Sequence, residues 1–358
     1  MVVDEVFIAE ALREQGEAFP YKRAFLGDPA VLFDNLCSDT SLYFFEQGAH
    51  PSWTYPGCFP GHTWYVRVAR GNYDKCDALA DYFTEEPRVR SRVRGKYTAF
   101  ETWEHYRRND FDVLVSAAKA GVEANPQGVE KILRGNCASA LKTFVLREAI
   151  YQLCYECTQF KPSLARAVLE FCSGHLGAAR DLSVLDPCMG WGDRLLAALS
   201  LNVRTYVGVD PNPEVHVWDE RALASLRAPG GTRVRNFCMP FEAASFSESF
   251  DVVFTSPPFF NYETYWCGSS IAERHQCAQR YERCGDWLRG WLVPFACKCL
   301  SLLKRGGLFV LHLSDTSAGS YCRELVSELE SRGFPLRGTL AFQREKGRVF
   351  PLWVWSSE

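Results

Sequence analysis

From about residue 181 onward, short β-branched runs alternate with stretches of helical periodicity, and this alternation limits the fold more than any other sequence feature. The candidate strands are residues 183–186, 205–210, 232–237, 251–255 and 308–313. Strands that alternate with helices are typical of a parallel, doubly wound sheet. Two further runs, 336–342 and 352–355, are joined by the polar segment 343–348 and indicate a terminal hairpin. The sequence therefore predicts an α/β fold with seven strands.

A long amphipathic segment lies between the fourth and fifth candidate strands. Within residues 281–303, large apolar side chains recur at helical spacing: Trp287, Leu288, Trp291, Leu292, Phe295 and Leu302. We expect one helix that packs on the sheet and stops at Gly306 and Gly307, because glycine readily ends helices. His312, in the apolar fifth strand, is expected in the core, and Asp315 beyond it is expected to cap a helix.

The region before residue 130 is rich in Trp, Tyr, Pro and Gly and has weaker periodicity. Its segment 88–96 places a cation at every second position. Read as a strand, this segment puts five cations on one face and Val89 and Val93 on the other. Arg90 and Arg92 are therefore candidate contacts for the phosphates of a substrate. A solvated strand face explains the same pattern equally well.

Length and charge set the outline of the molecule. The chain has 358 residues, 47% of them hydrophobic, which is enough for one large α/β domain and a smaller region. We expect an N-terminal α+β extension over residues 1–150 and the main domain over residues 151–358. The net charge is -3, whereas a protein that coats nucleic acid over its whole surface is usually strongly basic. Nucleic acid would have to be bound through a local patch and a pocket.

The start of the chain carries Asp4, Glu5 and Arg13, and no run approaches the roughly eighteen apolar residues of a membrane span. We therefore expect an intracellular protein, cytoplasmic or nuclear, with no membrane partner; the oligomeric state is not indicated. The fifteen cysteines are scattered through hydrophobic runs, and Cys154-x-x-Cys157 has no matching second pair. Reduced, mostly buried thiols are expected, with no metal site.

A glycine-containing turn follows the first candidate strand and opens a helix. Gly190 and Gly192 allow a sharp turn and close approach to a ligand, and the free N–H groups of the helix suit a carboxylate. Asp210 ends the second strand, 24 positions after Asp186, where a carboxylate can accept hydrogen bonds from both ribose hydroxyls. A nicotinamide site is disfavoured, because the third glycine of GxGxxG is missing.

These residues resemble the class I S-adenosylmethionine-dependent methyltransferases, a Rossmann-like fold with a seven-stranded mixed sheet. The resemblance implies that S-adenosyl-L-methionine is the cofactor. It places Asp186 and the glycine turn at the methionine end, Asp210 at the ribose and Glu242 near the adenine. A segment before the sheet, residues 156–163, resembles the part of these enzymes that folds over the cofactor. The implied cofactor contacts are Gln159, Phe160, Lys161, Pro162, Asp186, Cys188, Gly190, Gly192, Asp193, Asp210, Pro211 and Glu242.

The fourth strand runs directly into Ser256-Pro257-Pro258-Phe259. The two prolines end the strand and stiffen the backbone. An exocyclic amino group is a poor nucleophile, because its lone pair is delocalised into the ring. The Ser256 hydroxyl and the Pro257 carbonyl could accept its two N–H groups and direct the lone pair at a methyl donor. The Phe259 ring could stack on the base, which contributes about 1–3 kcal/mol.

The tetrapeptide resembles the (Asp/Asn/Ser)-Pro-Pro-(Tyr/Phe/Trp) signature of nucleic-acid amino-methyltransferases, which act on cytosine N4 or adenine N6. A longer resemblance, over roughly residues 80–355, is to uncharacterised methyltransferases of phages and large DNA viruses, through residues 81–86, 156–163, 186–193 and 255–265. The resemblance implies a DNA or RNA substrate and makes the tetrapeptide catalytic. The core lacks the long target-recognition insert of restriction-type enzymes, so residues 1–150 would select the substrate, which leaves RNA and capped 5′ ends open.

The loop after the tetrapeptide supplies further candidate contacts for the base: Phe260, Asn261, Tyr262 and Tyr265. Ordinary loop packing explains these side chains equally well. Three alternatives to the amino-methyltransferase remain open. They are a base methyltransferase of RNA or the mRNA cap that acts on another ring position, a non-catalytic subunit with the same fold, and a methyltransferase of small molecules or proteins.

Overall fold

The computed structural model describes residues 3–24, 26–38, 43–47, 63–68, 74–92, 97–134, 138–157, 159–177, 181–226, 231–260, 265, 277–317, 319–343 and 349–357. The chain divides into two compact units. We call one the sheet unit, which comprises Ala30–Ala80, Gln159–Tyr262 and Ser269–Glu358. The other is the helical unit, which comprises Met1–Pro29, Asp81–Thr158 and Glu263–Gly268.

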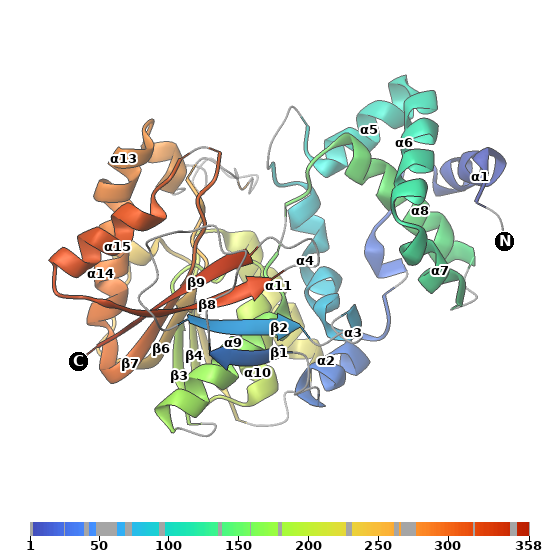
Figure 1. The fold of residues 1–358 in the computed structure, drawn as a ribbon. Helices are drawn as coiled ribbons and strands as arrows, with labels where there is room; N and C mark the ends of the chain where they lie inside the picture. The colour runs from blue at the N-terminus through green and yellow to red at the C-terminus, as the bar shows by residue number, and fades with distance from the viewer. Residues whose placement is uncertain are drawn as a thin grey trace. The chain divides into compact units, whose positions relative to one another are not determined.

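The sheet unit is built on one nine-stranded sheet with the order β1-β2-β8-β9-β7-β6-β3-β4-β5 (Figure 1). The strands are β1 Tyr43–Gln47, β2 Thr63–Val68, β3 Ser183–Asp186, β4 Thr205–Val209, β5 Arg233–Phe237, β6 Phe250–Thr255, β7 Leu303–His312, β8 Leu336–Gln343 and β9 Val349–Ser356. The five neighbouring strands β7, β6, β3, β4 and β5 run parallel to one another. β9 is antiparallel to both β7 and β8. The seven predicted strands and the terminal hairpin of β8 and β9 are thus confirmed.

Two strands extend the sheet beyond the predicted seven. β2 pairs in parallel with β8, and β1 pairs with β2 in antiparallel register. Because of these strands, Ala30–Ala80 belongs to the sheet unit. The division of the structure therefore does not coincide with the boundary expected near residue 150.

Helices flank the sheet on both faces. They are α2 Pro29–Ser38, α3 Asp74–Asp77, α9 Pro162–Leu176, α10 Asp193–Leu201, α11 Pro213–Ser225, α13 Cys284–Trp287, α14 Val293–Ser301 and α15 Cys322–Ser331. Short turns η2 Phe241–Ala243, η3 Cys277–Arg280 and η4 Leu288–Leu292 complete the unit. One buried cluster joins Trp287, Trp291 and Phe295 to Phe309 of β7 and Trp355 of β9. Side chains alternate along a strand, so the neighbours of Phe309 face the opposite side of the sheet.

The predicted helix over residues 281–303 is present, but its make-up and its last residue differ from the prediction. It consists of α13, the π-helical turn η4 and α14, and it ends at Ser301. Gly306 and Gly307 lie inside β7 instead of stopping the helix. The backbone of Gly307 approaches Phe250 and Asp251 so closely that a Cβ there would lie 3.0 Å from Asp251 O. Gly307 therefore allows the close approach of β7 to β6, whereas Gly306 adopts a positive φ of +76°.

The helical unit contains α1 Glu5–Gln15, η1 Lys22–Ala24, α4 Leu79–Val89, α5 Ala99–Asn109, α6 Phe111–Ala124, α7 Pro126–Arg134 and α8 Ala138–Leu153. Its core gathers buried side chains such as Leu12, Trp103, Leu114 and Val145. Thr98 and Glu101 cap the start of α5 reciprocally, each side chain binding the backbone N–H of the other residue. Among the described residues, no helix is long and apolar enough to cross a membrane.

The prediction of a strand over residues 88–96 is wrong where the structure describes this segment. Arg88 and Val89 form the last turn of α4, and Arg88 is buried instead of lying on a solvated cationic face. Its guanidinium pairs with Asp81 and with Glu156. Of the cations described in this segment, Arg88 is therefore neutralised inside the unit, whereas Arg92 is exposed.

Arg88 belongs to a buried charge network, which comprises Lys22, Asp81, Glu85, Arg88, Arg147 and Glu156. Arg147 is 1% exposed, and its guanidinium contacts both Glu85 and Glu156. Burial alone would raise the pKa of Glu156, but the charges of Lys22, Arg147 and Arg88 outweigh burial and lower that pKa to about 2. The network thus holds α4, α8 and the segment after α8 together through paired charges.

Candidate active site

The predicted glycine turn joins β3 to α10. Gly190 has φ +54° and Gly192 has φ +79°, a left-handed conformation that favours glycine. Gly192 is the N-cap of α10, so the N-terminal N–H groups of that helix face the turn. A Cβ at position 192 would lie 2.5 Å from Oδ1 of Asp219, so the turn also has no room for a side chain there.

Asp186 ends β3 beneath this turn and is fully buried. Its Oδ2 accepts hydrogen bonds from Arg194 Nε at 2.7 Å and from the Tyr206 hydroxyl at 2.9 Å. Its Oδ1 is buried and has no hydrogen-bond partner among the described residues. A buried carboxylate oxygen without a donor is costly unless a ligand supplies one. Asp186 is therefore suited to bind a cationic amino group.

Asp210 follows β4 and is held by the same turn. Its Oδ2 accepts the Gly190 N–H at 3.0 Å, and its Oδ1 accepts the Asn212 N–H at 2.9 Å. Burial raises the pKa of Asp210, although these two N–H donors oppose that effect. Each carboxylate oxygen can accept a second hydrogen bond, so Asp210 keeps capacity for two ligand hydroxyls.

The Pro-Pro corner, which we define as Ser256-Pro257-Pro258-Phe259, follows β6 directly beside the glycine turn. β6 pairs with β3, and the hydroxyl of Thr255 accepts the Cys188 N–H at 3.1 Å. Because both segments leave the carboxyl ends of neighbouring parallel strands, they meet at one edge of the sheet. The glycine turn and the Pro-Pro corner are therefore neighbours at the carboxyl edge of the sheet.

His312 ends β7 at this edge, and its expected place in the core is wrong. It is only half-buried, and its Nδ1 lies 2.9 Å from Oγ of Ser256. The Phe259 ring lies 5.6 Å from the imidazole, and the Phe160 ring meets the imidazole edge-on at 5.2 Å. The histidine thus links the Pro-Pro corner to the segment before α9.

Phe160 is a predicted cofactor contact that the structure places at the same edge. Its ring packs edge-on against Phe254 of β6 at 5.7 Å, and the Arg194 guanidinium lies 5.7 Å from its centre. Sequence reasoning missed both Arg194 and His312. The one signal for Arg194 is a charge within the apolar run of α10, because a buried arginine needs a carboxylate partner.

The other predicted contacts before and after the sheet have ordinary surroundings. Lys161 pairs with Asp77 at 3.5 Å. Pro162 is the first residue of α9, where the missing N–H of proline costs nothing. Gln159 and Pro211 are half-buried. Ser163 also donates its N–H to Asp77 at 3.1 Å, so Lys161 belongs to a polar cluster between α3 and α9.

Three predicted contacts are engaged within the protein. Asp193 opens α10 and is 2% exposed. Cys188 is half-buried, and burial raises the pKa of its thiol well above the ordinary value, so the thiol stays neutral. Glu242 Oε1 accepts hydrogen bonds from Trp291 Nε1 at 2.7 Å and from Arg280 at 2.9 Å.

The predicted contacts for the base are not all accessible. Phe260 is 4% exposed and packs on Trp287 at 5.6 Å, so it belongs to the hydrophobic core. Asn261 and Tyr262 lie outside the described residues, whereas Tyr265 is half-buried. Among the described residues of this segment, Phe259 is the aromatic ring that lies beside His312.

The two predicted phosphate contacts belong to the helical unit. The Arg90 guanidinium lies 3.8 Å from the centre of the Phe100 ring. Arg92 is exposed and lies 3.4 Å from Glu101. Both cations therefore already have partners in the protein, and Arg92, whose side chain is 49% exposed, is the more accessible of the two.

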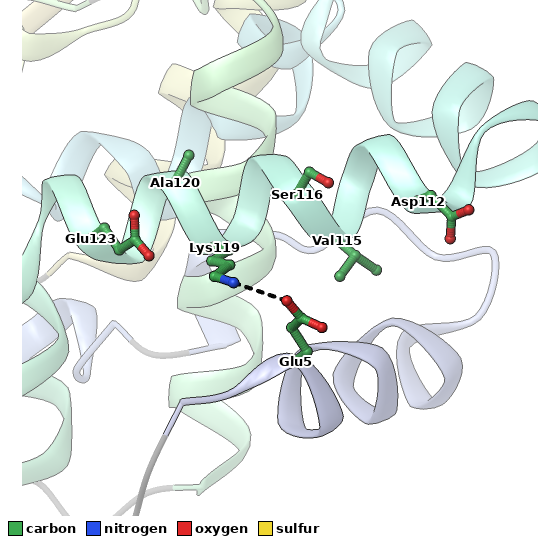
Figure 2. A pocket seen from close by; sticks show the side chains of 7 residues that line it. All are labelled: Glu5, Asp112, Val115, Ser116, Lys119, Ala120 and Glu123. Atoms are coloured by element: carbon green, nitrogen blue, oxygen red, sulfur yellow. Dashed lines mark hydrogen bonds and ion pairs between the residues drawn. The ribbon is translucent and has the colours of Figure 1, made fainter.

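A surface hollow of the helical unit lies between α1 and α6 (Figure 2). Its lining comprises Glu5, Asp112, Val115, Ser116, Lys119, Ala120 and Glu123. Lys119 donates to Glu5 at 2.9 Å across the hollow, and both side chains are exposed. Acidic residues dominate the lining, and none of the predicted site residues lies in it. We assign it no part in the chemistry.

No protein-family model matches the sequence, and no curated protein matches it. Solved structures do resemble it. A methyltransferase from Pyrococcus furiosus has 14% identity and a TM-score of 0.36, over 53% of this chain and 82% of that chain. Magnesium protoporphyrin IX methyltransferase from Synechocystis PCC 6803, with bound SAH, has 11% identity and a TM-score of 0.40, over 55% and 83%. The M. jannaschii tRNA m1G37 methyltransferase has 12% identity and a TM-score of 0.34, over 56% and 51%.

The TM-scores are low, so the fold assignment rests on the strand order. The sheet contains seven strands in the order β8-β9-β7-β6-β3-β4-β5, with β9 antiparallel to its neighbours. This is the mixed sheet expected from the sequence resemblance, and the glycine turn lies between β3 and α10 within it. The chain therefore has an α/β class I methyltransferase fold.

Proposed function

We propose that this protein transfers a methyl group from S-adenosyl-L-methionine to an exocyclic amino group of a nucleic-acid base, cytosine N4 or adenine N6. The observation that carries the proposal is the hydrogen bond from Cys188 N–H to Thr255, which joins the glycine turn to the Pro-Pro corner. A methyl donor in the turn and an amine at the corner would then share one edge of the sheet.

The residues of the turn fit the cofactor. The unpartnered Oδ1 of Asp186 would accept the amino group of its methionine part, and the N-terminal N–H groups of α10 would bind its carboxylate. Asp210 would accept the two ribose hydroxyls. When bound, the cofactor supplies an electrophilic sulfonium methyl group.

The Pro-Pro corner would prepare the amine. Ser256 Oγ and the carbonyl of Pro257 would each accept one N–H of the amino group, which withdraws the nitrogen lone pair from the ring. The lone pair would then form the N–C bond while the S–C bond of the methyl donor breaks, and the product amine would release a proton to water. Phe259 would stack on the base. Positioning and electrostatics carry this chemistry, because no proton has to leave before the attack.

Incubation with labelled S-adenosylmethionine and pooled DNA and RNA, followed by mass spectrometry of the nucleosides, tests the proposal. We expect N4-methylcytosine or N6-methyladenine. If cofactor binds but only proteins or small molecules become labelled, the protein is instead a methyltransferase of proteins or small molecules. If another ring position of RNA is methylated, the amino-group chemistry is wrong. If cofactor does not bind at all, the chain is a non-catalytic relative.

We further propose that the partner is DNA or RNA and that residues 1–150 select it. Arg92 supports this proposal in a limited way, because its side chain is 49% exposed even though its guanidinium lies 3.4 Å from Glu101. Arg92→Glu should weaken nucleic-acid binding in a mobility-shift assay without changing cofactor affinity. Glu104→Lys in α5, where the side chain is 40% exposed, is a control that adds a positive charge to the same unit and should not weaken nucleic-acid binding.

A further inference from the structure

Serine at the first position of the Pro-Pro corner creates a requirement that Asp or Asn does not. The oxygen of a carboxylate or of an amide only accepts hydrogen bonds, whereas a serine hydroxyl also carries a hydrogen of its own. If that hydrogen points at the substrate, it opposes the N–H of the amine. The hydrogen of Ser256 must therefore be directed to an acceptor of the protein before Ser256 can bind the amine.

The structure provides such an acceptor in His312. Its Nδ1 lies 2.9 Å from Ser256 Oγ. The two residues directly follow the paired residues Thr255 and Leu311 of β6 and β7, so the sheet register places them opposite one another. This contact is therefore fixed by backbone pairing and does not depend on a mobile loop.

Two aromatic rings pack against the imidazole and hold it in one orientation. The Phe160 ring meets it at an interplanar angle of 80°, and the Phe259 ring meets it at 45°. These contacts restrict rotation of the His312 imidazole about the Cβ–Cγ bond. Nδ1 is thus kept directed at Ser256 before any substrate arrives, which lowers the cost of organising the site.

We propose that His312 is a positioning residue that sets the orientation of the Ser256 hydroxyl. In this arrangement His312 is neutral and carries its hydrogen on Nε2, and its Nδ1 accepts the hydrogen of Ser256. The lone pairs of Ser256 Oγ then face the amine. The proposal rests on the proposed function for the identity of the amine, but the state of the imidazole is a property of the protein alone.

Nuclear magnetic resonance of protein with 15N-labelled histidine tests the state of the imidazole without substrate. The chain has 7 histidines, and the signal that His312→Asn removes identifies residue 312. We expect the Nε2–H tautomer at neutral pH and a shift of the Nδ1 resonance in Ser256→Ala, which keeps the fold. A hydrogen on Nδ1, or no response to Ser256→Ala, would overturn the proposal.

Kinetics of a rescue series tests the role in the reaction. His312→Ala should lower kcat about tenfold with little change in the KM for S-adenosylmethionine, since one oriented hydrogen bond is lost. In a Ser256→Asn background the same change should cost less than twofold, because the amide oxygen needs no partner to act as acceptor. Equal losses in the two backgrounds would show a merely structural role and contradict the proposal.

The two experiments separate this inference from the proposed function. If the wild-type protein methylates no nucleic acid, the proposed function fails, and the resonance experiment still decides the state of His312. If the wild-type protein is active but the hydrogen resides on Nδ1, only the role of His312 is wrong.

Discussion

The backbone N–H of Cys188 donates a hydrogen bond of 3.1 Å to the side-chain hydroxyl of Thr255. Cys188 belongs to the glycine turn after β3, and Thr255 is the last residue of β6 before the Pro-Pro corner. This single contact fixes the distance between the segment that would hold the methyl donor and the segment that would hold the acceptor. A hydrogen bond of this kind allows one site to be assembled from residues almost seventy positions apart.

Replacement of Thr255 by valine should therefore weaken both halves of the site. Valine keeps the shape but leaves the Cys188 N–H without an acceptor, which costs about 1–3 kcal/mol for a buried group. We expect lower cofactor affinity by calorimetry and a lower kcat. Ser331→Ala, which removes an exposed hydroxyl at the end of α15, should change neither. Unchanged cofactor affinity in Thr255→Val would show that the two segments are not coupled.

Gly192→Ala should disrupt the turn for two reasons. The residue has φ +79°, and the new Cβ would lie 2.5 Å from Asp219 Oδ1. Strain of this kind costs of order 1–3 kcal/mol. Both the thermal midpoint and the cofactor affinity should fall.

Gly333→Ala is the matched control for that change. Gly333 also has a positive φ, +88°, but no atom of the described residues lies within 4 Å of the position of its Cβ. This variant should lose stability without losing cofactor affinity. If both glycine variants lose affinity equally, the effect comes from general destabilisation and not from the turn.

Asp219 should make stability depend on pH. Burial raises the pKa of this carboxyl well above its ordinary value, and the nearby charges of Asp210 and Asp186 raise it further. The protonated form of Asp219 is therefore favoured in the folded protein. Its contribution to the stability of the fold is complete below the unfolded pKa of about 3.9 and is lost as pH rises.

Asp219→Asn tests that dependence, because asparagine is neutral at every pH and can still accept the hydrogen bond from Asn236. The variant should gain stability relative to the wild type between pH 4 and pH 8, as measured by urea unfolding. A difference in stability that does not change over this range would mean that Asp219 is not protonated preferentially in the folded state.

Glu156 should show the opposite dependence. Its pKa is lowered to about 2 by the surrounding cations, so its stabilising contribution is present above its unfolded pKa and is lost as pH falls toward 2. Glu156→Gln should cost about 3 kcal/mol of unfolding free energy at pH 7, because buried cations lose their partner. The cost should shrink at pH 3.

Glu104→Gln provides the comparison for the buried network. Glu104 forms an exposed pair with Arg108 at 3.5 Å, and such pairs contribute less than about 1 kcal/mol. If both variants cost the same at pH 7, the network around Arg147 does not stabilise the helical unit.

Local sequence patterns predicted much of the sheet unit. The strands β3 to β9 were recognisable because buried strands are short β-branched runs between turn residues. Gly190 and Gly192 were recognisable because only glycine suits a turn with positive φ. Asp315 was correctly expected to cap a helix: its Oδ1 accepts the N–H groups of Tyr321 and Cys322 at the start of α15.

Residues whose role depends on distant partners were not recognisable. His312 lies in an apolar run, and only the pairing of β6 with β7 brings it to Ser256. The segment around Arg88 was misread because the spacing of charges does not reveal whether a cation faces water or, like Arg88, the buried carboxylates of Asp81 and Glu156. β1 and β2 were missed because the pairing of β2 with β8 joins residues more than 270 positions apart, and β1 joins the sheet through β2.

A crystal structure of the protein with S-adenosylhomocysteine tests the central claim most directly, namely that the glycine turn and the Pro-Pro corner form one site. We predict that the amino group of the ligand binds Asp186 Oδ1, that its ribose binds Asp210, and that its sulfur faces Ser256 and Phe259. A ligand bound away from the glycine turn, or a sulfur directed away from the Pro-Pro corner, would contradict the account.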